Sequence, residues 1–165
     1  RFSGEQRAIY ELVLAAQDAA LATIRPASNF DSPHAAATRV LVQGLIDLGL
    51  LSGSIEAVLE SGAHRQFYMH RTGHWLGLDV HDAGDYREPQ AAQDGAERPW
   101  RSLQPGMALT VEPGLYLRPA ANVPERFWNI GVRIEDDVLV TRDGNEVLSR
   151  DAPKTIAEIE ALMKH

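Results

Sequence analysis

Three of the chain's six histidines, His70, His74 and His81, lie in one short segment. His70 and His74 have the spacing of two zinc ligands on a helix, but that motif needs a glutamate directly after the first histidine, and Arg71 stands there. Gly73 weakens a helix further. We therefore predict a strand and turn that present separate histidines. Each can be a metal ligand or a partly buried side chain paired with backbone groups.

Glu112 is the first of two glutamates on predicted strands. Alternation along a strand puts Thr110 and Glu112 on one face and Leu109 and Val111 on the other. Pro113 cannot donate a hydrogen bond to a sheet, so the strand should bend or end where this carboxylate projects. The glutamate is then either a ligand or a solvated residue before a turn.

Glu135 is the second glutamate, on a strand predicted over 131–141. Arg133 and Glu135 share one face of this strand, about 6.6 Å apart at ~3.3 Å per residue, and Val132 and Ile134 share the other. Arg133 can form a simple ion pair with Glu135, which is weak on a surface. Alternatively, it can orient a carboxylate that binds a metal.

Taken together, a histidine and two strand-borne glutamates form a donor set that suits Mn, Co, Fe or Zn. Two carboxylates able to bridge suggest a pair of ions ~3.5–4 Å apart. The chain has no cysteine, which excludes disulfides, thiolate sites and thiol catalysis. Neither a G-x-S-x-G nor a Walker A sequence occurs. A glycosidase pair of carboxylates would leave the histidines without a role.

The composition is ordinary for a soluble globular protein, and 165 residues suffice for one domain with its own core. The net charge of -7 and the scattered basic residues argue against a nucleic-acid partner. No apolar run reaches the ~18 residues of a membrane span and no signal peptide opens the sequence, so we expect no membrane partner and a cytoplasmic location. The chain begins at Arg1 without an initiator methionine, and we expect an upstream part to be missing.

Local signals predict the elements that position these residues. Ser3 and Gln6 form a capping box before a first helix, which Pro26 limits. A second helix begins near residue 31 or 32, with Pro33 in its first turn and Gly49 just past its end. Further predicted elements are a short helix at 55–59, strands at 107–117, 131–141 and 146–148, a surface loop at 86–102 and a last helix opened by Pro153. Helices followed by strands indicate an α+β fold.

Three ordered motifs resemble the pita-bread metallopeptidases, the family of aminopeptidase P, prolidase, methionine aminopeptidase and creatinase. They are H-x-x-x-H-x-x-G-L-D-V-H-D at His70–Asp82, T-V-E-P-G-x-Y at Thr110–Tyr116 and G-x-R-I-E-D-D at Gly131–Asp137. The likeness covers essentially the whole chain, and His74-Trp75-Leu76-Gly77 favours aminopeptidase P over prolidase. It implies a pita-bread fold of two related halves. It also implies release of the N-terminal residue from peptides with proline in second position, which makes Xaa-Pro peptides the expected partners.

The resemblance also assigns a metal site. His74, Glu112 and Glu135 match metal ligands of the family. Glu135 would bridge two ions, and Glu112 would also take a proton from the nucleophile. The implied cofactor is two divalent metal ions, commonly Mn(II).

Three more residues match the substrate side of the family site. His70 and His81 match histidines that line the substrate pocket and stabilise the tetrahedral intermediate. Arg133 matches an arginine that lies behind the ligands or beside the substrate.

The family site has two further ligands, both aspartates, which belong upstream of the first helix. Asp18 and Asp31 do not replace them, because they fall in a helix and at a helix cap. Three of five ligands remain, so we expect a partial or empty metal site and a poorly active chain. Residues 1–165 would form the second half of the fold with helices of the first half. An open sheet edge would then favour self-association, and we expect a homo-oligomer.

Three functions remain open at this point. The first is a Xaa-Pro aminopeptidase to which this chain contributes part of the catalytic domain. The second is a Xaa-Pro dipeptidase, or prolidase. The third, suggested by the missing aspartates, is a pita-bread binding module without catalytic activity.

Overall fold

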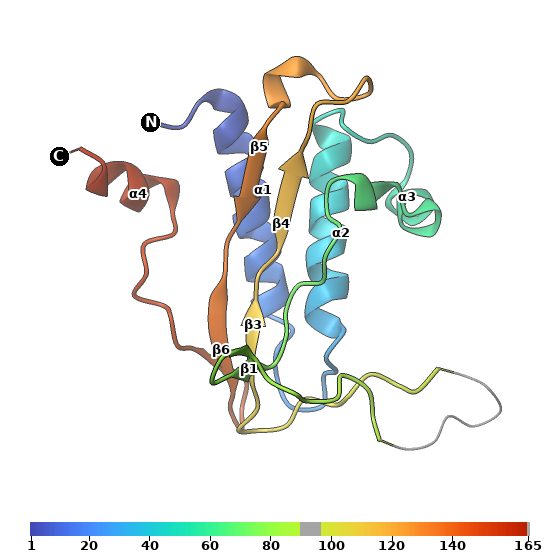
Figure 1. Cartoon of the computed structure of the whole chain (residues 1–165), viewed down its shortest axis with the longest axis vertical. Helices are drawn as coiled ribbons and strands as arrows, with labels where there is room; N and C mark the ends of the chain where they lie inside the picture. The colour runs from blue at the N-terminus through green and yellow to red at the C-terminus, as the bar shows by residue number, and fades with distance from the viewer. Residues whose placement is uncertain (90–96, 165) are drawn as a thin grey trace.

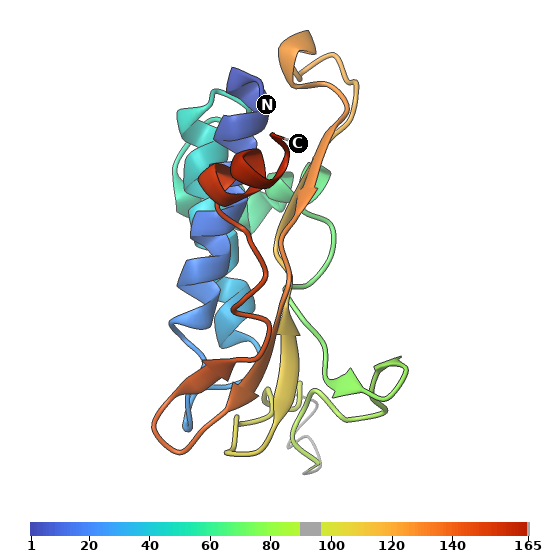
Figure 2. The same ribbon diagram turned by 90° about the vertical axis from the view of Figure 1, so that its left-hand side faces the viewer.

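The chain folds into two layers in the computed structural model, which describes residues 1–89 and 97–164 (Figure 1). Two long helices, α1 (Gly4–Leu21) and α2 (Ser32–Asp47), lie side by side on one face of antiparallel strands. Seen from the side, a segment with β1 (Leu76–Gly77) and β2 (Val80–His81) projects from the opposite face of the strands (Figure 2). The mixture of helices and strands confirms the predicted α+β class.

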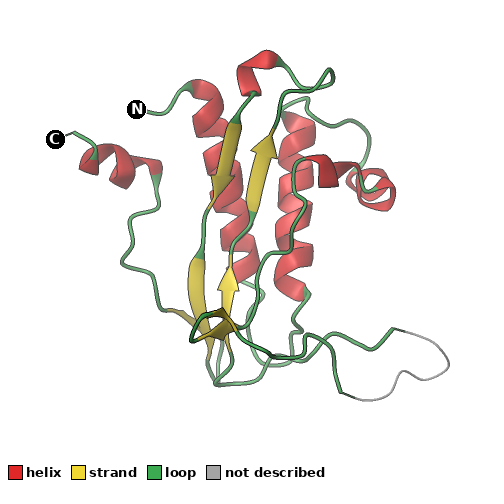
Figure 3. Ribbon diagram, viewed as in Figure 1, coloured by secondary structure: helices red, strands yellow, loops and turns green. Residues whose placement is uncertain are grey.

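Besides the small β1–β2 sheet, the described strands form two antiparallel sheets, which follow one another along the same two segments of the chain (Figure 3). In the first sheet, β6 (Asp136–Val140) lies between β3 (Ala108–Val111) and β7 (Asn145–Val147). In the second, β4 (Gly114–Leu117) pairs with β5 (Ile130–Arg133).

Both long predicted strands are therefore broken, and the breaks face each other. Residues 107–117 divide at Glu112 and Pro113, where the missing N–H of proline interrupts the sheet. Residues 131–141 divide at Ile134 and Glu135, so the prediction of one continuous strand was wrong. The cause lies across the sheet: the Ile134 N–H bonds to the Pro113 carbonyl at 3.3 Å, and Pro113 has no N–H to return.

The helices follow their local signals. The capping box of Ser3 is present at the start of α1, and Gly49 takes a left-handed φ of 71° after α2. The short predicted helix is α3 (Ile55–Ser61), followed by the 3₁₀ turn η1 (Ala63–Gln66). The last helix, α4 (Ile156–Leu162), starts later than predicted. Its first turn is capped by Thr155, whose hydroxyl accepts the Glu158 N–H, so Pro153 lies outside the helix.

The core lies between the two long helices and the strands. Fully or almost fully buried side chains come from both layers: Ile9, Val13, Leu41 and Leu45 from the helices, and Leu109, Val111, Leu115 and Val138 from the strands. Burying one such side chain contributes ~1.5–3 kcal/mol. This packing fixes the strands by their inner face and leaves the outer face of β3 for polar side chains.

The predicted surface loop is joined at its ends. Arg87 and Trp100 form an isolated antiparallel bridge, and the Arg87 guanidinium lies 3.5 Å from the centre of the Trp100 ring. The Arg71 guanidinium lies 4.3 Å from the same ring, so this loop is attached to the segment that carries the site histidines. Residues 90–96 of the loop lie outside the described residues.

One side of the molecule has an open strand edge. In the described part of the chain, β5 pairs with β4 alone and is connected to it by the 3₁₀ turn η2 (Glu125–Phe127). A groove of about 480 Å³ lies between the N-terminal residues, β5 and α4; apolar side chains in it include Phe2, Val132 and Met163. Within residues 1–89 and 97–164, we find no helix that is both long and apolar enough to cross a membrane.

Candidate metal site

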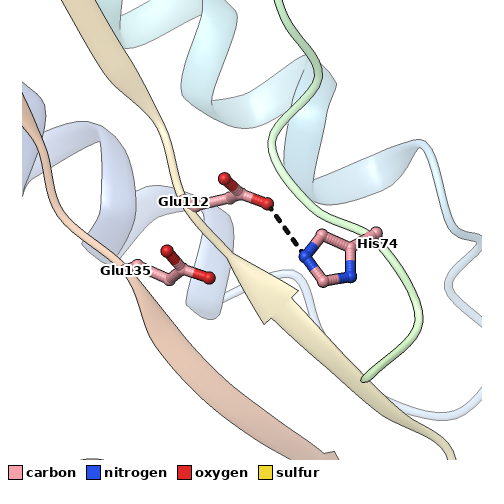
Figure 4. A group of neighbouring side chains, drawn as sticks. All are labelled: His74, Glu112 and Glu135. Atoms are coloured by element: carbon pink, nitrogen blue, oxygen red, sulfur yellow. Dashed lines mark ion pairs between the residues drawn. The ribbon is translucent and has the colours of Figure 1, made fainter. Parts of the chain in front are cut away.

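The two strand breaks bring Glu112 and Glu135 together on the face away from the helices. Val111 pairs with Asp136 at the end of one sheet and Gly114 pairs with Arg133 at the start of the other, so the two breaks lie opposite each other. Glu112, Glu135 and His74 direct their side chains toward one point (Figure 4). One ligand atom of each lies within 4.8 Å of the others.

His74 reaches this point because its segment runs antiparallel along β3. The Thr110 N–H donates to the His74 carbonyl at 2.9 Å, and the Glu112 N–H donates to the Thr72 carbonyl at 2.6 Å. A side chain at Gly73 would place its Cβ 2.0 Å from the Thr110 carbonyl oxygen. Glycine is therefore required at this close approach, and the helix rejected from the sequence is absent here.

A hydrogen bond to the backbone fixes the tautomer and the orientation of the His74 ring. Its Nδ1 lies 2.9 Å from the Trp75 carbonyl oxygen. Because a carbonyl can only accept, Nδ1 carries the hydrogen and Nε2 keeps its lone pair. Nε2 lies 3.4 Å from Glu112 Oε1. A backbone carbonyl behind a histidine ligand is the usual way to fix its tautomer and ring orientation.

Both oxygens of the Glu112 carboxylate are held. Oε1 accepts from the Thr110 hydroxyl at 3.1 Å, and Oε2 accepts from Arg133 Nη1 at 3.1 Å. The Thr110 hydroxyl also accepts the His74 N–H at 3.1 Å and so connects His74 with Glu112. Glu112 is 8% exposed, so it is not the solvated glutamate of the alternative hypothesis. Thr110 was not singled out from the sequence, although strand alternation had placed it on the same face.

Glu135 completes the cluster from the other strand break. Its burial and then the nearby charge of Glu112 raise the pKa of the Glu135 carboxyl, against the opposing charges of His74 and Arg133. Two carboxylates and an imidazole lone pair at one point are unfavourable without a cation and favourable with one. The donor set thus fits a divalent metal ion.

Arg133 joins the cluster to Tyr116, and no salt bridge between Arg133 and Glu135 occurs among the described residues. Its Nη1 binds Glu112, while its Nε donates to the Tyr116 hydroxyl at 2.7 Å. The simple ion pair considered between Arg133 and Glu135 is not among the salt bridges of the described residues. The alternative hypothesis, in which Arg133 orients a carboxylate of the cluster, agrees with these contacts.

His70 lies at the end of the same network. His70 Nδ1 lies 2.7 Å from the Arg71 carbonyl oxygen and therefore carries a hydrogen, so Nε2 accepts from the Tyr116 hydroxyl at 2.9 Å. Tyr116 thus connects His70 with Arg133. It was not assigned a role from the sequence, although it is four residues after Glu112 and so at the period of one strand face.

His81 approaches the cluster from β2. Its ring centre lies 4.2 Å from that of His74. The preceding residue, Val80, has a left-handed φ of 67°, which is unusual for a β-branched residue and turns the chain back toward His74.

The other acidic candidates lie elsewhere. Asp31 pairs with Arg71, and Asp18 belongs to α1. Asp136 is 2% exposed and accepts from the Ser149 hydroxyl at 2.6 Å, so its carboxylate is buried and engaged by Ser149. Among the described residues, the cluster therefore consists of His74, Glu112 and Glu135.

This site and fold define a class of protein. The family model described as metallopeptidase family M24 matches residues 1–142, and the chain belongs to this family.

Among its relatives, the Xaa-Pro aminopeptidase of Haemophilus influenzae is 47% identical over 163 residues, which cover 99% of this chain and 36% of the relative. The Xaa-Pro dipeptidase of Rattus norvegicus is 41% identical over 184 residues, covering 99% and 37%. The chain thus spans about a third of the length of these relatives.

Solved structures agree with the fold. The structure of Pseudomonas aeruginosa aminopeptidase PepP matches with a TM-score of 0.91 and 53% identity, covering 99% of this chain and 35% of that one. Escherichia coli aminopeptidase P with the inhibitor Pro-Leu matches with a TM-score of 0.88 and 45% identity, covering 99% and 35%. The predicted pita-bread fold is confirmed.

Proposed function

We propose that this chain is part of the catalytic domain of a metal-dependent exopeptidase that releases the N-terminal residue from peptides with proline in second position. The convergence of His74, Glu112 and Glu135 within 4.8 Å carries the proposal. Xaa-Pro aminopeptidases that match 99% of the chain support it. Because they are about three times longer, we assign the activity to the complete protein. In that protein, residues 1–165 would be the C-terminal portion of the pita-bread domain.

The cluster residues would hold the metal ions. His74 offers Nε2, and Glu112 and Glu135 offer carboxylate oxygens that can bridge. Divalent ions bound there would act as Lewis acids and make water nucleophilic near neutral pH. Upstream aspartates of the complete protein would add the remaining ligands.

Glu112 would also move the proton during hydrolysis. As the water oxygen attacks the scissile carbonyl carbon, the carboxylate takes a water proton and passes it to the proline nitrogen when the C–N bond breaks. The products are a free amino acid and a peptide that begins with proline. Thr110 and Arg133 hold both carboxylate oxygens, which keeps the base aligned during the transfer.

His70 and His81 would line the substrate side and stabilise the tetrahedral intermediate. His70 has both ring nitrogens engaged, by the Arg71 carbonyl and the Tyr116 hydroxyl. Donation from His70 Nε2 to a substrate oxygen therefore requires that the ring gain a proton and that the Tyr116 hydroxyl turn away. Arg133 would couple this change to Glu112, because it contacts both Tyr116 and Glu112.

We further propose Mn(II) as the metal, two ions as the complement, the cytoplasm as the location and a homo-oligomer as the assembly. Oxygen-rich ligands with one imidazole support a hard or borderline divalent ion. The absence of cysteine is compatible with a reducing compartment. The edge of β5 that is unpaired among the described residues supports association between copies of the isolated chain.

The decisive experiment is Mn(II)-dependent release of the first residue from a Xaa-Pro-Xaa tripeptide by the complete protein. Glu112→Ala should lower kcat by at least ~10³-fold, since it removes a ligand and the base. Glu146→Ala, an exposed glutamate on β7, is the matched control. Near-parental turnover by Glu112→Ala would contradict the site. A preference for a Xaa-Pro dipeptide would favour the dipeptidase, and stable peptide binding without hydrolysis would favour the binding module.

A further inference from the structure

Gln17 is a polar residue in the apolar core between α1 and the strands. Its side chain is 0% exposed, and the neighbouring buried positions of α1 are Val13, Ala16 and Ala20. Its amide nitrogen donates to the Val111 carbonyl at 3.2 Å. Its Oε1 is buried and has no hydrogen-bond partner among the described residues.

This arrangement lowers folding stability. The Gln17 Oε1 loses its hydrogen bonds to water on folding and gains none from the described residues in return. Methionine or leucine would fill a similar volume at this position without that loss. The orientation of the amide is set, because the Val111 carbonyl can only accept. Gln17 therefore makes a single hydrogen bond in a place where an apolar residue would be more stable.

That hydrogen bond reaches the peptide group that presents Glu112. The Val111 carbonyl and the Glu112 N–H belong to the same planar peptide. Gln17 holds its carbonyl end, and the Thr72 carbonyl holds its N–H end at 2.6 Å. Val111 and Asp136 form the last pair of the β3–β6 sheet, and Pro113 follows without an N–H to continue it, so the Gln17 and Thr72 contacts supplement this last pair in fixing the peptide plane at the strand break.

The contacts of Gln17 and Thr72 at the two ends of the Val111–Glu112 peptide form a clamp. The Thr72 side of this clamp is itself fixed. The Thr72 hydroxyl lies 2.9 Å from His34 Nδ1 and is hydrogen bonded to the Tyr68 hydroxyl. Thr72 and Tyr68 are 2% and 3% exposed, so this contact is shielded from water. On the other side, Val111 is paired with Asp136 in the β3–β6 sheet, and its carbonyl also accepts from the Gln17 amide.

We propose that Gln17 is a positioning residue for Glu112: through the Val111 carbonyl, it sets the peptide plane from which the Glu112 carboxylate reaches the metal cluster. Metal sites require ligand orientation to within ~10–20°, and a rotation of this peptide would turn the Glu112 side chain away from His74 and Glu135. The clamp is a property of the metal-free chain. Only its consequence for metal binding rests on the proposed function.

The test compares Gln17→Met with the parent in the complete protein. The matched control is Gln43→Met, the same change at an exposed position of α2. We expect Gln17→Met to leave the Tm of the metal-free protein unchanged or raised, while Mn²⁺ affinity measured by calorimetry falls about tenfold. The control should change neither. An unchanged Mn²⁺ affinity in Gln17→Met, or a loss that merely parallels a fall in Tm, would overturn the proposal.

A second readout does not depend on metal or activity. The exchange rate of the Glu112 amide hydrogen, measured by NMR in the metal-free complete protein, should rise about tenfold in Gln17→Met relative to amides within α2. If the parent neither binds Mn²⁺ nor cleaves peptides, the proposed function fails while this measurement still tests the clamp. Unchanged Glu112 exchange would refute it. Failure of both Gln17→Met and Gln17→Leu to fold would also refute it, because the residue would then be structural.

Discussion

At the scale of single residues, the site holds two carboxylates, and the described residues provide hydrogen-bond donors for only one of them. Glu112 receives hydrogen bonds at both oxygens, from Thr110 and Arg133. Glu135 has no such partner in the described residues, and burial together with the charge of Glu112 raises the pKa of its carboxyl. A cation between them removes the repulsion that the protein leaves unrelieved, which is why the cluster favours metal binding.

Replacing Arg133 should show how much the orientation of the Glu112 carboxylate contributes to activity, because Arg133 is not itself one of the three cluster residues. Arg133→Met removes the contacts to both Glu112 and Tyr116, and kcat of the complete protein should fall by about 10–100-fold. For Arg133→Lys, kcat should fall less, because lysine keeps the positive charge. It should still fall, because lysine lacks the planar guanidinium that contacts both Glu112 and Tyr116. Steady-state kinetics on a tripeptide measure both. Arg150→Met, at an exposed arginine, serves as the control, and equal kcat in all four proteins would contradict this role.

His34 gives the fold a defined dependence on pH. Burial first, and then the charge of Arg71, lower the pKa of His34 to about 4; Asp31 opposes this, and His64 and His70 add to it. Between the ordinary value of 6.5 and about 4, the unfolded chain binds a proton that the folded chain does not. The contribution of neutral His34 is thus complete above pH 6.5 and is lost as pH falls toward 4.

The prediction is that His34→Asn flattens this part of the stability curve. Asparagine can form a hydrogen bond with the Thr72 hydroxyl in either direction but does not titrate. Urea unfolding of the complete metal-free protein between pH 4 and 7 should show a smaller fall in the free energy of unfolding for the variant than for the parent. Parallel curves for the two proteins would show that His34 is not the group responsible.

At the scale of elements, the site depends on the close approach of the His74 segment to β3. Gly73→Ala would force a Cβ to within 2.0 Å of the Thr110 carbonyl oxygen, so the two backbones must separate. We expect a destabilisation of about 1–3 kcal/mol and weakened metal binding, since Glu112 and His74 move apart. Chemical denaturation and calorimetry measure these effects. Gly4→Ala, where the added Cβ meets nothing within 4 Å, should change neither.

The elements also show which features of the fold can be predicted from the sequence. The helices were predictable because their signals are local: the capping box at Ser3 and the glycine at position 49 act within a few residues. The break at Pro113 was predictable for the same reason. The break at Glu135 was not, because its cause is a proline on the partner strand. The motifs singled out the three residues that the structure brings together, whereas Gln17 could not be recognised, since its partner Val111 is 94 residues away.

At the scale of the whole molecule, the described residues leave an apolar surface beside β5. The groove of about 480 Å³ beside β5 includes Phe2, Val132 and Met163, and β5 has an unpaired edge in the described part of the chain. The chain spans about a third of its relatives' length, so further residues of a complete protein are available to cover such a surface. An isolated 165-residue chain should therefore be marginally stable and self-associate.

Val132→Lys tests this expectation in two contexts. In the isolated chain, a charge in the groove should reduce self-association, seen as a shift toward monomer in sedimentation velocity at equal concentration. In the complete protein, the same charge would be buried without a partner if the groove is covered, and Tm should fall by several degrees. Lys164→Ala, at the polar rim of the groove, is the control in both contexts. If the isolated parent chain is a monomer with a sharp melting transition, the expected self-association is wrong. If Val132→Lys leaves the Tm of the complete protein unchanged, the groove is open to solvent in that protein.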